Sequence, residues 1–464
     1  MAFNHYTIPN EYAETDERAE REFDELLESS RSAYVIPRTA FDGYRVKRGL
    51  READGTGVMA GVTRVGSAHG YVLNEGEKFP VDGVLEYRGY DLRDLIENFT
   101  SENRFGFEET CFLLFFGHLP TRDELAEFND LLAALRRLPP RFTEDIIMKA
   151  PSRSIMNKLQ SAVISLYAYD DNPDDVTLDN MLRQSIEIVS RLPVIAAQSY
   201  AVYRNAFFNK SLNLHNPHDN LSTAENFLRV LRPDKKYTDA EAHLLDLCLV
   251  IHAEHGGGNC STFTTRVLSS SGTDTYSAIA GGIGALKGPR HGGANLKVQE
   301  MFDEIKANVA NPKNDDELSS YLLKILNKQA GDGSGLIYGM GHAVYTKSDP
   351  RAVLLKRFAR EQAYEKGFGD DFDLLESIER LTPDLFRNFK GITQEMCANV
   401  DMYSGLVYRM LGIPTEMYTP LFTIARVPGW CAHRIEEYMT SGKIIRPAYK
   451  YIAKKQKFKN PDER

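Results

Sequence analysis

The sequence predicts a mostly α-helical protein, because helix-start signals followed by helically spaced apolar residues recur along it. Thr121 with Glu124 forms a capping box before a run of apolar residues that Pro139 and Pro140 end. Thr238 and Glu241 form a second capping box, before another apolar run. Further helical patterns cover residues 154–169, 296–308, 318–328, 351–366 and 403–411. We therefore expect an all-α fold with only minor β-structure.

That β-structure is expected near residues 56–90, where glycine alternates with short β-prone pieces typical of small hairpins. At 464 residues, the chain is long enough for two or three lobes. The clearest candidate for an internal linker is the segment "NVANPKNDDE", residues 308–317.

Composition excludes several classes of protein. A net charge of −9 disfavours nucleic acid as a partner, and the longest apolar runs, such as "CFLLFF", are too short to span a bilayer. The five cysteines are scattered, and their odd number suits reduced thiols rather than a disulfide framework. The N-terminus is acidic and lacks the apolar segment of an export signal. We therefore expect a cytoplasmic protein.

The stretch "GGIGALKGPRHGGAN", residues 281–295, raises the question of what its six glycines approach. It lacks both GxxxxGK[ST] and GxGxxG, so a phosphate-binding loop is disfavoured. Close helix packing explains Gly281, Gly282 and Ala285. It does not explain His291, whose small neighbours leave the ring open to a ligand.

A second histidine segment, "HAEHGGGN", ends the helix predicted after Thr238. His252 and His255 lie three residues apart, so we expect them to share a helix face before the glycines end the helix. A zinc site would need a third ligand, and no HExxH motif is present. We therefore predict no metal, and ligand binding by His255 stays open.

Two further segments combine helix starts with charge. Asp349 and Pro350 have the residue types of an N-cap and a first helical position, which places Arg351 in the first turn. A cation there favours an added anion, such as a carboxylate or phosphate, although a surface arginine is the alternative. Asp401 precedes another predicted helix and is either a simple N-cap or an ionised general base.

The C-terminal part adds Arg426, close to the only tryptophan, Trp430, and Arg446 in a basic tail interleaved with aromatic residues. One short terminal stretch on an acidic protein is weak support for nucleic-acid binding. We expect the tail to dock on its own protein or on a partner subunit.

Taken in order, these segments resemble the citrate synthase family. The matching motifs are "YRGYDLRDLI", "FEETCFLLFFGHLPTRDEL", "HAEHGGGNCSTF", "GPRHGGAN", "GMGHAVYTKSDPRA", "NVDMYSG", "RVPGWCAHRIEE" and "IIRPAYKY". The resemblance implies a large helical domain from residues 1–292 and 412–464, a smaller helical domain from residues 293–411, and an active site in the cleft. It also implies a homodimer.

The resemblance assigns roles to individual residues. His291, His342 and Asp401 match the catalytic trio, and His255, Arg351, Arg426 and Arg446 match the oxaloacetate-binding residues, with Arg446 supplied by the neighbouring subunit. Lys347 is a candidate contact to a phosphate of coenzyme A (CoA). The implied reaction is the condensation of acetyl-CoA with oxaloacetate and hydrolysis of citryl-CoA to citrate, with a CoA thioester as co-substrate and no tightly bound cofactor.

Two alternatives remain. A 2-methylcitrate synthase that uses propionyl-CoA would share nearly all these motifs, since one methylene changes binding by only about 1–3 kcal/mol. A non-catalytic CoA or dicarboxylate sensor would be expected to have lost Asp401 or His291, and both are present. Arg290 stands where many family members have an apolar residue, and roughly the first 50 residues match no part of the family. Acyl-CoA preference, allosteric control and assembly beyond a dimer stay open.

Overall fold

The computed structural model describes residues 21–463, apart from 25–26, 28–29, 31–33, 42, 53–54, 76, 392–394 and 441. The chain forms two compact units, residues 1–60 and 61–464. The described part of the first unit contains the short 3₁₀ turns η3 (Arg38–Phe41) and η4 (Arg48–Leu50), neither of which has a buried residue. The first 20 residues of the acidic N-terminus lie outside the described residues.

The second unit opens with a small antiparallel sheet, as expected for this region. Its strands are paired in the order β1 (Gly66–Asn74), β2 (Glu77–Tyr87) and β3 (Tyr90–Asp91). Gly66 is opposite Tyr87 and Asn74 is opposite Glu77, with a register shift between His69 and Tyr71. The predicted hairpins therefore resolve into one hairpin with a short third strand.

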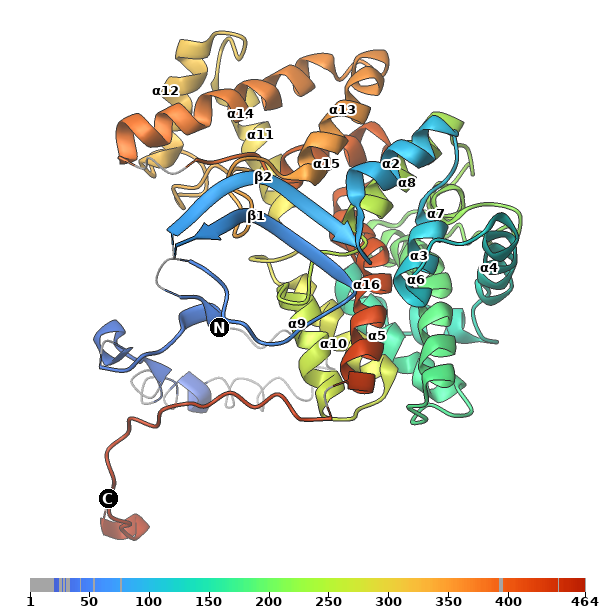
Figure 1. Ribbon diagram of the computed structural model, residues 1–464, viewed down its shortest axis with the longest axis horizontal. Helices are drawn as coiled ribbons and strands as arrows, with labels where there is room; N and C mark the ends of the chain where they lie inside the picture. Colours follow the sequence, from blue (N-terminus) through green and yellow to red (C-terminus); the bar gives the residue numbers. More distant parts are fainter. Residues whose placement is uncertain are drawn as a thin grey trace. The chain divides into compact units, whose positions relative to one another are not determined.

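The rest of the second unit is helical, which confirms the predicted fold class (Figure 1). The helices before the glycine-rich stretch are α2 (Leu92–Ser101), α3 (Phe107–Phe116), α4 (Arg122–Leu135), α5 (Ile155–Leu166), α6 (Leu178–Phe208), α7 (Thr223–Leu231), α8 (Asp239–His252) and α9 (Cys260–Ser270). The later helices are α10 (Thr275–Lys287), α11 (Ala294–Asn308), α12 (Asp315–Leu326), α13 (Pro350–Glu365), α14 (Gly369–Lys390), α15 (Asp401–Met410) and α16 (Tyr418–Thr440). Among the described residues, no helix combines the length and apolar character needed to cross a bilayer.

Local signals set several helix ends as predicted. Both capping boxes form, with Thr121 and Glu124 at α4 and with Thr238 and Glu241 at α8. Asp349 caps α13, and Pro350 is its first residue. The linker expected at residues 308–317 does not separate compact units, because only residues 309–314 form a loop, between α11 and α12 inside the second unit. There, Val309 is buried and Asn314 caps α12.

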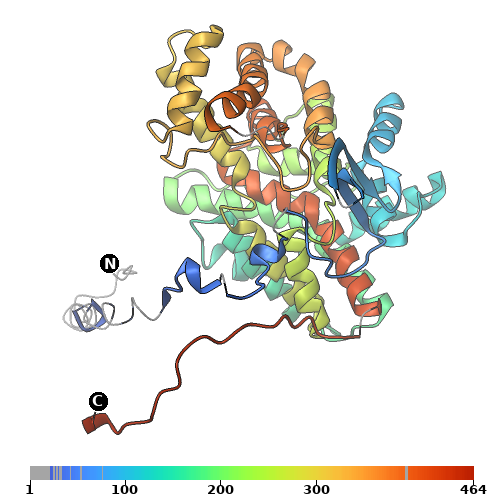
Figure 2. The same cartoon turned by 60° about the vertical axis from the view of Figure 1, so that its left-hand side comes forward.

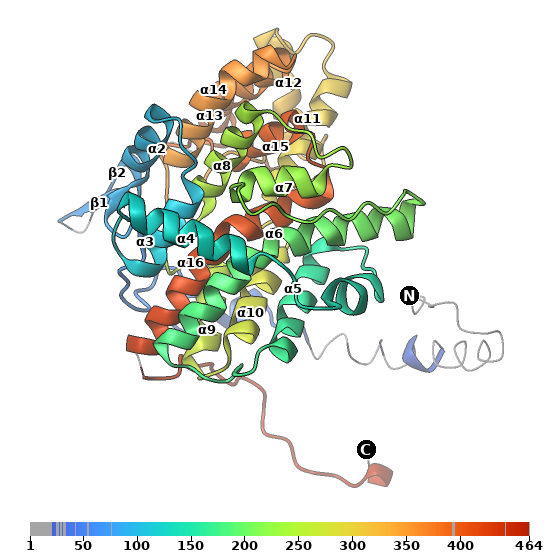
Figure 3. The same ribbon diagram turned by 90° about the vertical axis from the view of Figure 1, so that its right-hand side faces the viewer.

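Helix α16 forms the centre of the larger helix group and packs against α3, α5, α6, α8, α9 and α10 (Figures 1 and 3). Its middle is fully buried and includes Arg426, Trp430 and His433. Helices α11 to α15 pack mainly on one another, with α11 against α15 and α12 against α14. The described residues between α16 and η8 (Pro461–Glu463) form no helix or strand, as Figure 2 shows.

The glycines of α10 allow this close packing. A Cβ atom on Gly282 would lie 2.6 Å from Thr265 Oγ1 and 3.2 Å from the Trp430 ring, and one on Gly284 would lie 2.6 Å from Gln160 Nε2. A Cβ atom on Gly281 would likewise lie too close to the Leu268 side chain, 2.1 Å from its Cδ1. The packing interpretation of this stretch is therefore confirmed. It places the end of α10, and the turn that carries His291, directly against α9 and α16.

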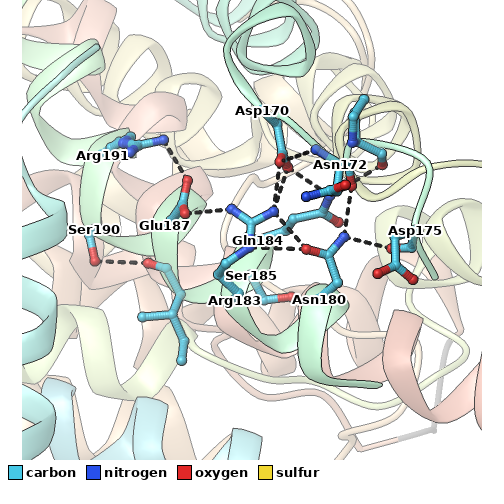
Figure 4. A network of polar contacts seen from close by, with 12 residues as sticks. Asp170, Asn172, Asp175, Asn180, Arg183, Gln184, Ser185, Glu187, Ser190 and Arg191 are labelled. Atoms are coloured by element: carbon cyan, nitrogen blue, oxygen red, sulfur yellow. Dashed lines mark hydrogen bonds and ion pairs between the residues drawn. The ribbon is translucent and has the colours of Figure 1, made fainter. Parts of the chain in front are cut away.

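A polar network fixes the other end of α10 (Figure 4). Arg183 on α6 donates to both carboxylate oxygens of Asp170, at 2.7 and 2.8 Å, and Gln184 donates to the same carboxylate at 2.8 Å. The Tyr276 hydroxyl on α10 also donates to Asp170, at 2.7 Å. Together these bonds tie the loop after α5 to the start of α10.

Candidate active site

Six of the predicted site residues lie near helix ends, in the loop before α13 or in the middle of α16. His255 follows α8, His291 lies in the turn between α10 and α11, and His342 lies in the loop before α13. The other members are Arg351 in the first turn of α13, Asp401 at the start of α15 and Arg426 within α16.

Arg426 is the electrostatic centre of this group. It is fully buried, and its Nε donates to the carbonyl of His252. Its Nη1 and Nη2 atoms have no hydrogen-bond partner among the described residues. Its pKa is lowered to about 10, chiefly by burial, with the nearby Arg351 adding to the shift and Glu254 opposing it. Buried polar groups are normally paired, so two unpartnered guanidinium nitrogens indicate an anion-binding site.

His255 and His342 lie beside this guanidinium-lined region. Their rings meet edge to face with centroids 5.2 Å apart, and the Nε2 atom of His255 is buried without a partner. Burial, with Arg351 and His342 nearby, lowers the pKa of His255 well below its usual value, so the ring is neutral. His252 does not share a helix face with His255, because α8 ends at His252. The His252 Nδ1 atom instead donates to the carbonyl of Cys248 at 2.7 Å.

The backbone fixes the tautomer of His342. The amides of Val344 and Tyr345 both donate to its Nδ1 atom, at 3.1 and 3.2 Å. A nitrogen that accepts two hydrogen bonds carries no hydrogen, so the neutral ring carries it on Nε2. That atom lies 3.5 Å from Arg351 Nη2, which is only a donor and so cannot accept the Nε2 hydrogen. The hydrogen is therefore available to an acceptor on an anion bound by Arg351.

His291 has the opposite tautomer. Its Nε2 atom accepts from the backbone amide of Ser261 at 3.3 Å and contacts the Ser261 hydroxyl at 2.9 Å, and Trp430 Nε1 donates to that hydroxyl. The hydrogen is therefore on Nδ1. Burial, assisted by Arg426, lowers the pKa of His291 to about 4, so the ring is a neutral donor at physiological pH.

Asp401 is the first residue of α15 and does not cap it. The Asn399 side chain accepts from the Asp401 amide at 3.0 Å, so the N-cap interpretation is wrong. Burial raises the pKa of Asp401 to about 6, and Arg351 and Arg426 limit the rise while Asp349 adds to it. The carboxylate is thus still mainly ionised at pH 7, and its pKa is close to the operating pH that suits a general base.

Arg351 is buried at this site and is not a surface arginine. Its Nε and Nη2 atoms donate to the two oxygens of Asp349, at 3.0 and 2.8 Å. The Asp349 carboxylate therefore provides part of the negative charge expected at the start of α13. Asp349 has its pKa lowered despite complete burial, because Arg351 stabilises the charged form.

A charged cluster behind Arg426 was not predicted from the sequence. Glu254 accepts from His433 Nε2 at 2.8 Å and from the Gly256 amide at 2.5 Å, and Arg266 donates to His433 Nδ1 at 2.7 Å. The Glu254 carboxylate occupies space that a Cβ atom on Gly429, one turn after Arg426, would fill. Only the tertiary contact of α16 with the loop after α8 reveals this buried counter-charge.

Two predicted residues lie apart from the others. Lys347 is half exposed, with its Nζ 4.0 Å from Asp82 Oδ2. Arg446 is exposed in the segment after α16, and no hydrogen bond or ion pair joins it to the site within the described part of the chain. The described residues also contain no cluster of three or more side chains suited to a metal ion. All five cysteines carry free thiols.

Comparisons with known proteins agree with the motifs. Residues 56–448 match the family model "Citrate synthase, C-terminal domain". Citrate synthase of Corynebacterium glutamicum is 36% identical over 392 residues, covering 82% of this chain and 83% of that protein. Citrate synthase of Deinococcus radiodurans is 35% identical over 371 residues, covering 80% and 90%.

Solved structures give the same result for the fold. Citrate synthase from Thermotoga maritima has a TM-score of 0.70 and 29% identity, covering 90% of this chain and 98% of that one. The complex of carboxymethyl coenzyme A and oxaloacetate with citrate synthase from Thermoplasma acidophilum has a TM-score of 0.72, with 26% identity and the same coverage. The matched motifs, the helical fold and these relatives together place the chain in the citrate synthase family.

Proposed function

We propose that this protein condenses acetyl-CoA with oxaloacetate and hydrolyses the resulting citryl-CoA to citrate and CoA. The observation that carries the proposal is the pair of unpartnered Nη atoms on buried Arg426, next to Arg351 and the neutral ring of His255. Two arginines and a donor suit a small dicarboxylate, because a guanidinium binds a carboxylate through two parallel hydrogen bonds. Oxaloacetate has this charge and size.

The first chemical step is removal of a proton from the methyl group of the thioester. Asp401 takes this proton, and the Nδ1–H of His291 donates to the thioester oxygen as negative charge develops there. The Nδ1 proton of His291 passes to that oxygen, so the product is an enol of the thioester, and Asp401 holds the methyl proton. A base with a pKa of about 6 and a neutral histidine donor suit this step, since a thioester methyl group is a weak carbon acid.

The second step forms the new carbon–carbon bond. The enol carbon attacks the ketone carbon of oxaloacetate, the electrons of the C=O bond move to its oxygen, and the Nε2–H of His342 protonates that oxygen. The enol proton returns to Nδ1 of His291 as the thioester carbonyl reforms. The tautomer that Val344 and Tyr345 impose supports this role. Water then hydrolyses the citryl-CoA thioester, and no tightly bound cofactor takes part.

The assembly that we propose is a homodimer in the cytoplasm. Arg446 lies outside its own site in an exposed tail, so we assign it to the neighbouring subunit's oxaloacetate site. Residues 293–411 form the proposed small domain, consistent with the mutual packing of α11 to α15. The two domains would meet at the cleft, with Lys347 near a CoA phosphate.

The decisive experiment measures thiol release by the purified protein with oxaloacetate and either acetyl-CoA or propionyl-CoA. We expect a higher kcat/KM with acetyl-CoA. A higher value with propionyl-CoA would instead identify a 2-methylcitrate synthase. If neither thioester reacts while oxaloacetate still binds, the enzymatic proposal is wrong and a dicarboxylate sensor remains.

A further inference from the structure

The side chain of Tyr345 contacts several residues of the site, but only the backbone amide of this residue has a role in the reaction described above. It is fully buried, and its ring stacks on that of His342 with centroids 4.7 Å apart and an interplanar angle of 20°. The same ring meets His255 edge to face at 5.6 Å, and the guanidinium carbon of Arg351 lies 5.8 Å from its centroid. One aromatic side chain thus contacts three groups that surround the proposed oxaloacetate position.

The main chain and the side chain of Tyr345 act on different properties of His342. The amide donates to Nδ1 and thereby selects the tautomer, whereas the ring covers one face of the imidazole and limits its tilt. The hydroxyl is buried and has no hydrogen-bond partner in the part of the chain that the structure describes, so it contributes no hydrogen bond to this arrangement. Replacing the side chain therefore tests the ring while leaving the amide in place.

The β1–β2 hairpin confines Tyr345 through two glycines. A Cβ atom on Gly70 would lie 2.8 Å from the Val344 carbonyl oxygen and 3.0 Å from the Tyr345 Cα atom. A Cβ atom on Gly83 would lie 2.6 Å from Tyr345 Cδ1. The Gly83 amide also donates to the carbonyl of Ser348 at 3.1 Å, so the hairpin is bonded directly to the loop that carries His342.

We infer that Tyr345, confined by Gly70 and Gly83, is a positioning residue for His342, and that its ring is required for carbon–carbon bond formation but not for enol formation. The inference rests on the proposed function, in which His342 protonates the ketone oxygen while Asp401 and His291 act on the thioester methyl group. A displaced His342 imidazole would slow protonation of the ketone oxygen but not removal of the methyl proton. A shift of about 1 Å can reduce a rate by roughly 100-fold.

The test compares Tyr345→Phe and Tyr345→Leu in two assays. The first is citrate formation. The second is exchange of the methyl protons of acetyl-CoA with solvent deuterium, measured with a saturating, unreactive oxaloacetate analogue bound. We expect the rates of Tyr345→Phe to stay within about threefold of the parent rates in both assays, since no described residue bonds to the hydroxyl. Tyr345→Leu should lose about tenfold or more in citrate formation, with exchange nearly unchanged.

The matched control is Tyr276→Leu. Tyr276 is equally buried but bonds to Asp170, away from the site, so its loss should lower thermal stability without separating the two assays. If Tyr345→Leu does not fold, Gly70→Ala replaces it, because the added methyl group pushes on Val344 and Tyr345 while leaving His342 and Tyr345 intact. The same selective loss is expected.

Equal losses in the two assays, or a Tyr345→Leu variant as active as the parent, would overturn the inference. Failure of the proposed function looks different, because the parent protein itself would then form no citrate.

Discussion

Replacing Asp401 by asparagine should make the protein more stable at neutral pH while removing most of its activity. Burial raises the pKa of this carboxyl from its usual 3.8 to about 6, so the folded protein holds the proton more tightly than the unfolded chain does. The stability gained from protonation is fully present below about pH 4 and is lost as pH rises through about 6. Above that pH, the ionised carboxylate destabilises the folded state.

The size of the stability difference follows from the pKa shift of Asp401. A difference of roughly two pKa units corresponds to about 3 kcal/mol, which is an upper limit because the carboxyl group is not completely shielded from solvent. Asparagine has nearly the same shape and does not ionise. We therefore expect the free energy of unfolding of Asp401→Asn to exceed that of the parent by up to about 3 kcal/mol at pH 7.5. The difference should be close to zero at pH 4.

The assay is equilibrium urea unfolding of both proteins at the two pH values, at one protein concentration because a dimer is proposed. Asp384→Asn on α14 is the control, since this carboxylate is mostly exposed and its loss should change stability little at either pH. Turnover of Asp401→Asn should fall by roughly 100-fold or more. A variant that is no more stable than the parent at pH 7.5 would refute the burial argument, and near-normal turnover would remove Asp401 from the mechanism.

Three further predictions follow from the site. In the parent, kcat/KM for acetyl-CoA should fall about tenfold per pH unit below about pH 6, as Asp401 becomes protonated; a profile flat from pH 7 to 5 would contradict this. His291→Ala should abolish methyl-proton exchange with a bound oxaloacetate analogue, whereas His342→Ala should retain exchange and lose citrate formation; equal exchange in both variants would refute this division of roles. Mixing inactive Arg446→Ala with inactive Asp401→Asn should restore one working site in up to about half of the dimers, by pairing statistics for a two-fold dimer. If activity does not return after verified subunit exchange, Arg446 does not act across the interface.

The features predicted correctly from the sequence are those that nearby residues determine. The capping boxes at α4 and α8 and the cap and proline at α13 each depend on residues within four positions of one another. The motif resemblance also selected the buried groups that lie around Arg426. A short stretch of sequence is enough to predict the helix ends, because the hydrogen bonds that define them join residues close together in the chain.

The features that were missed depend on tertiary contacts. The tautomer of His291 depends on Ser261. The negative charge behind Arg426 comes from Glu254, which lies in the loop after α8 and accepts from His433 on α16. The segment around Val309 resembled a linker because its composition is polar, but the burial of one side chain holds it in the core. Likewise, the helix signals before Asp401 did not show that the Asn399 side chain accepts from the Asp401 amide.

A bound dicarboxylate would supply hydrogen-bond partners to the two buried Nη nitrogens of Arg426. A dicarboxylate that pairs with them binds only the folded form, and at 100 times its dissociation constant such a ligand adds about 2.7 kcal/mol to folding stability. We therefore expect oxaloacetate supply to govern the lifetime of this enzyme in the cell as well as its rate. When the dicarboxylate is scarce, a larger fraction of molecules opens and becomes available to proteases.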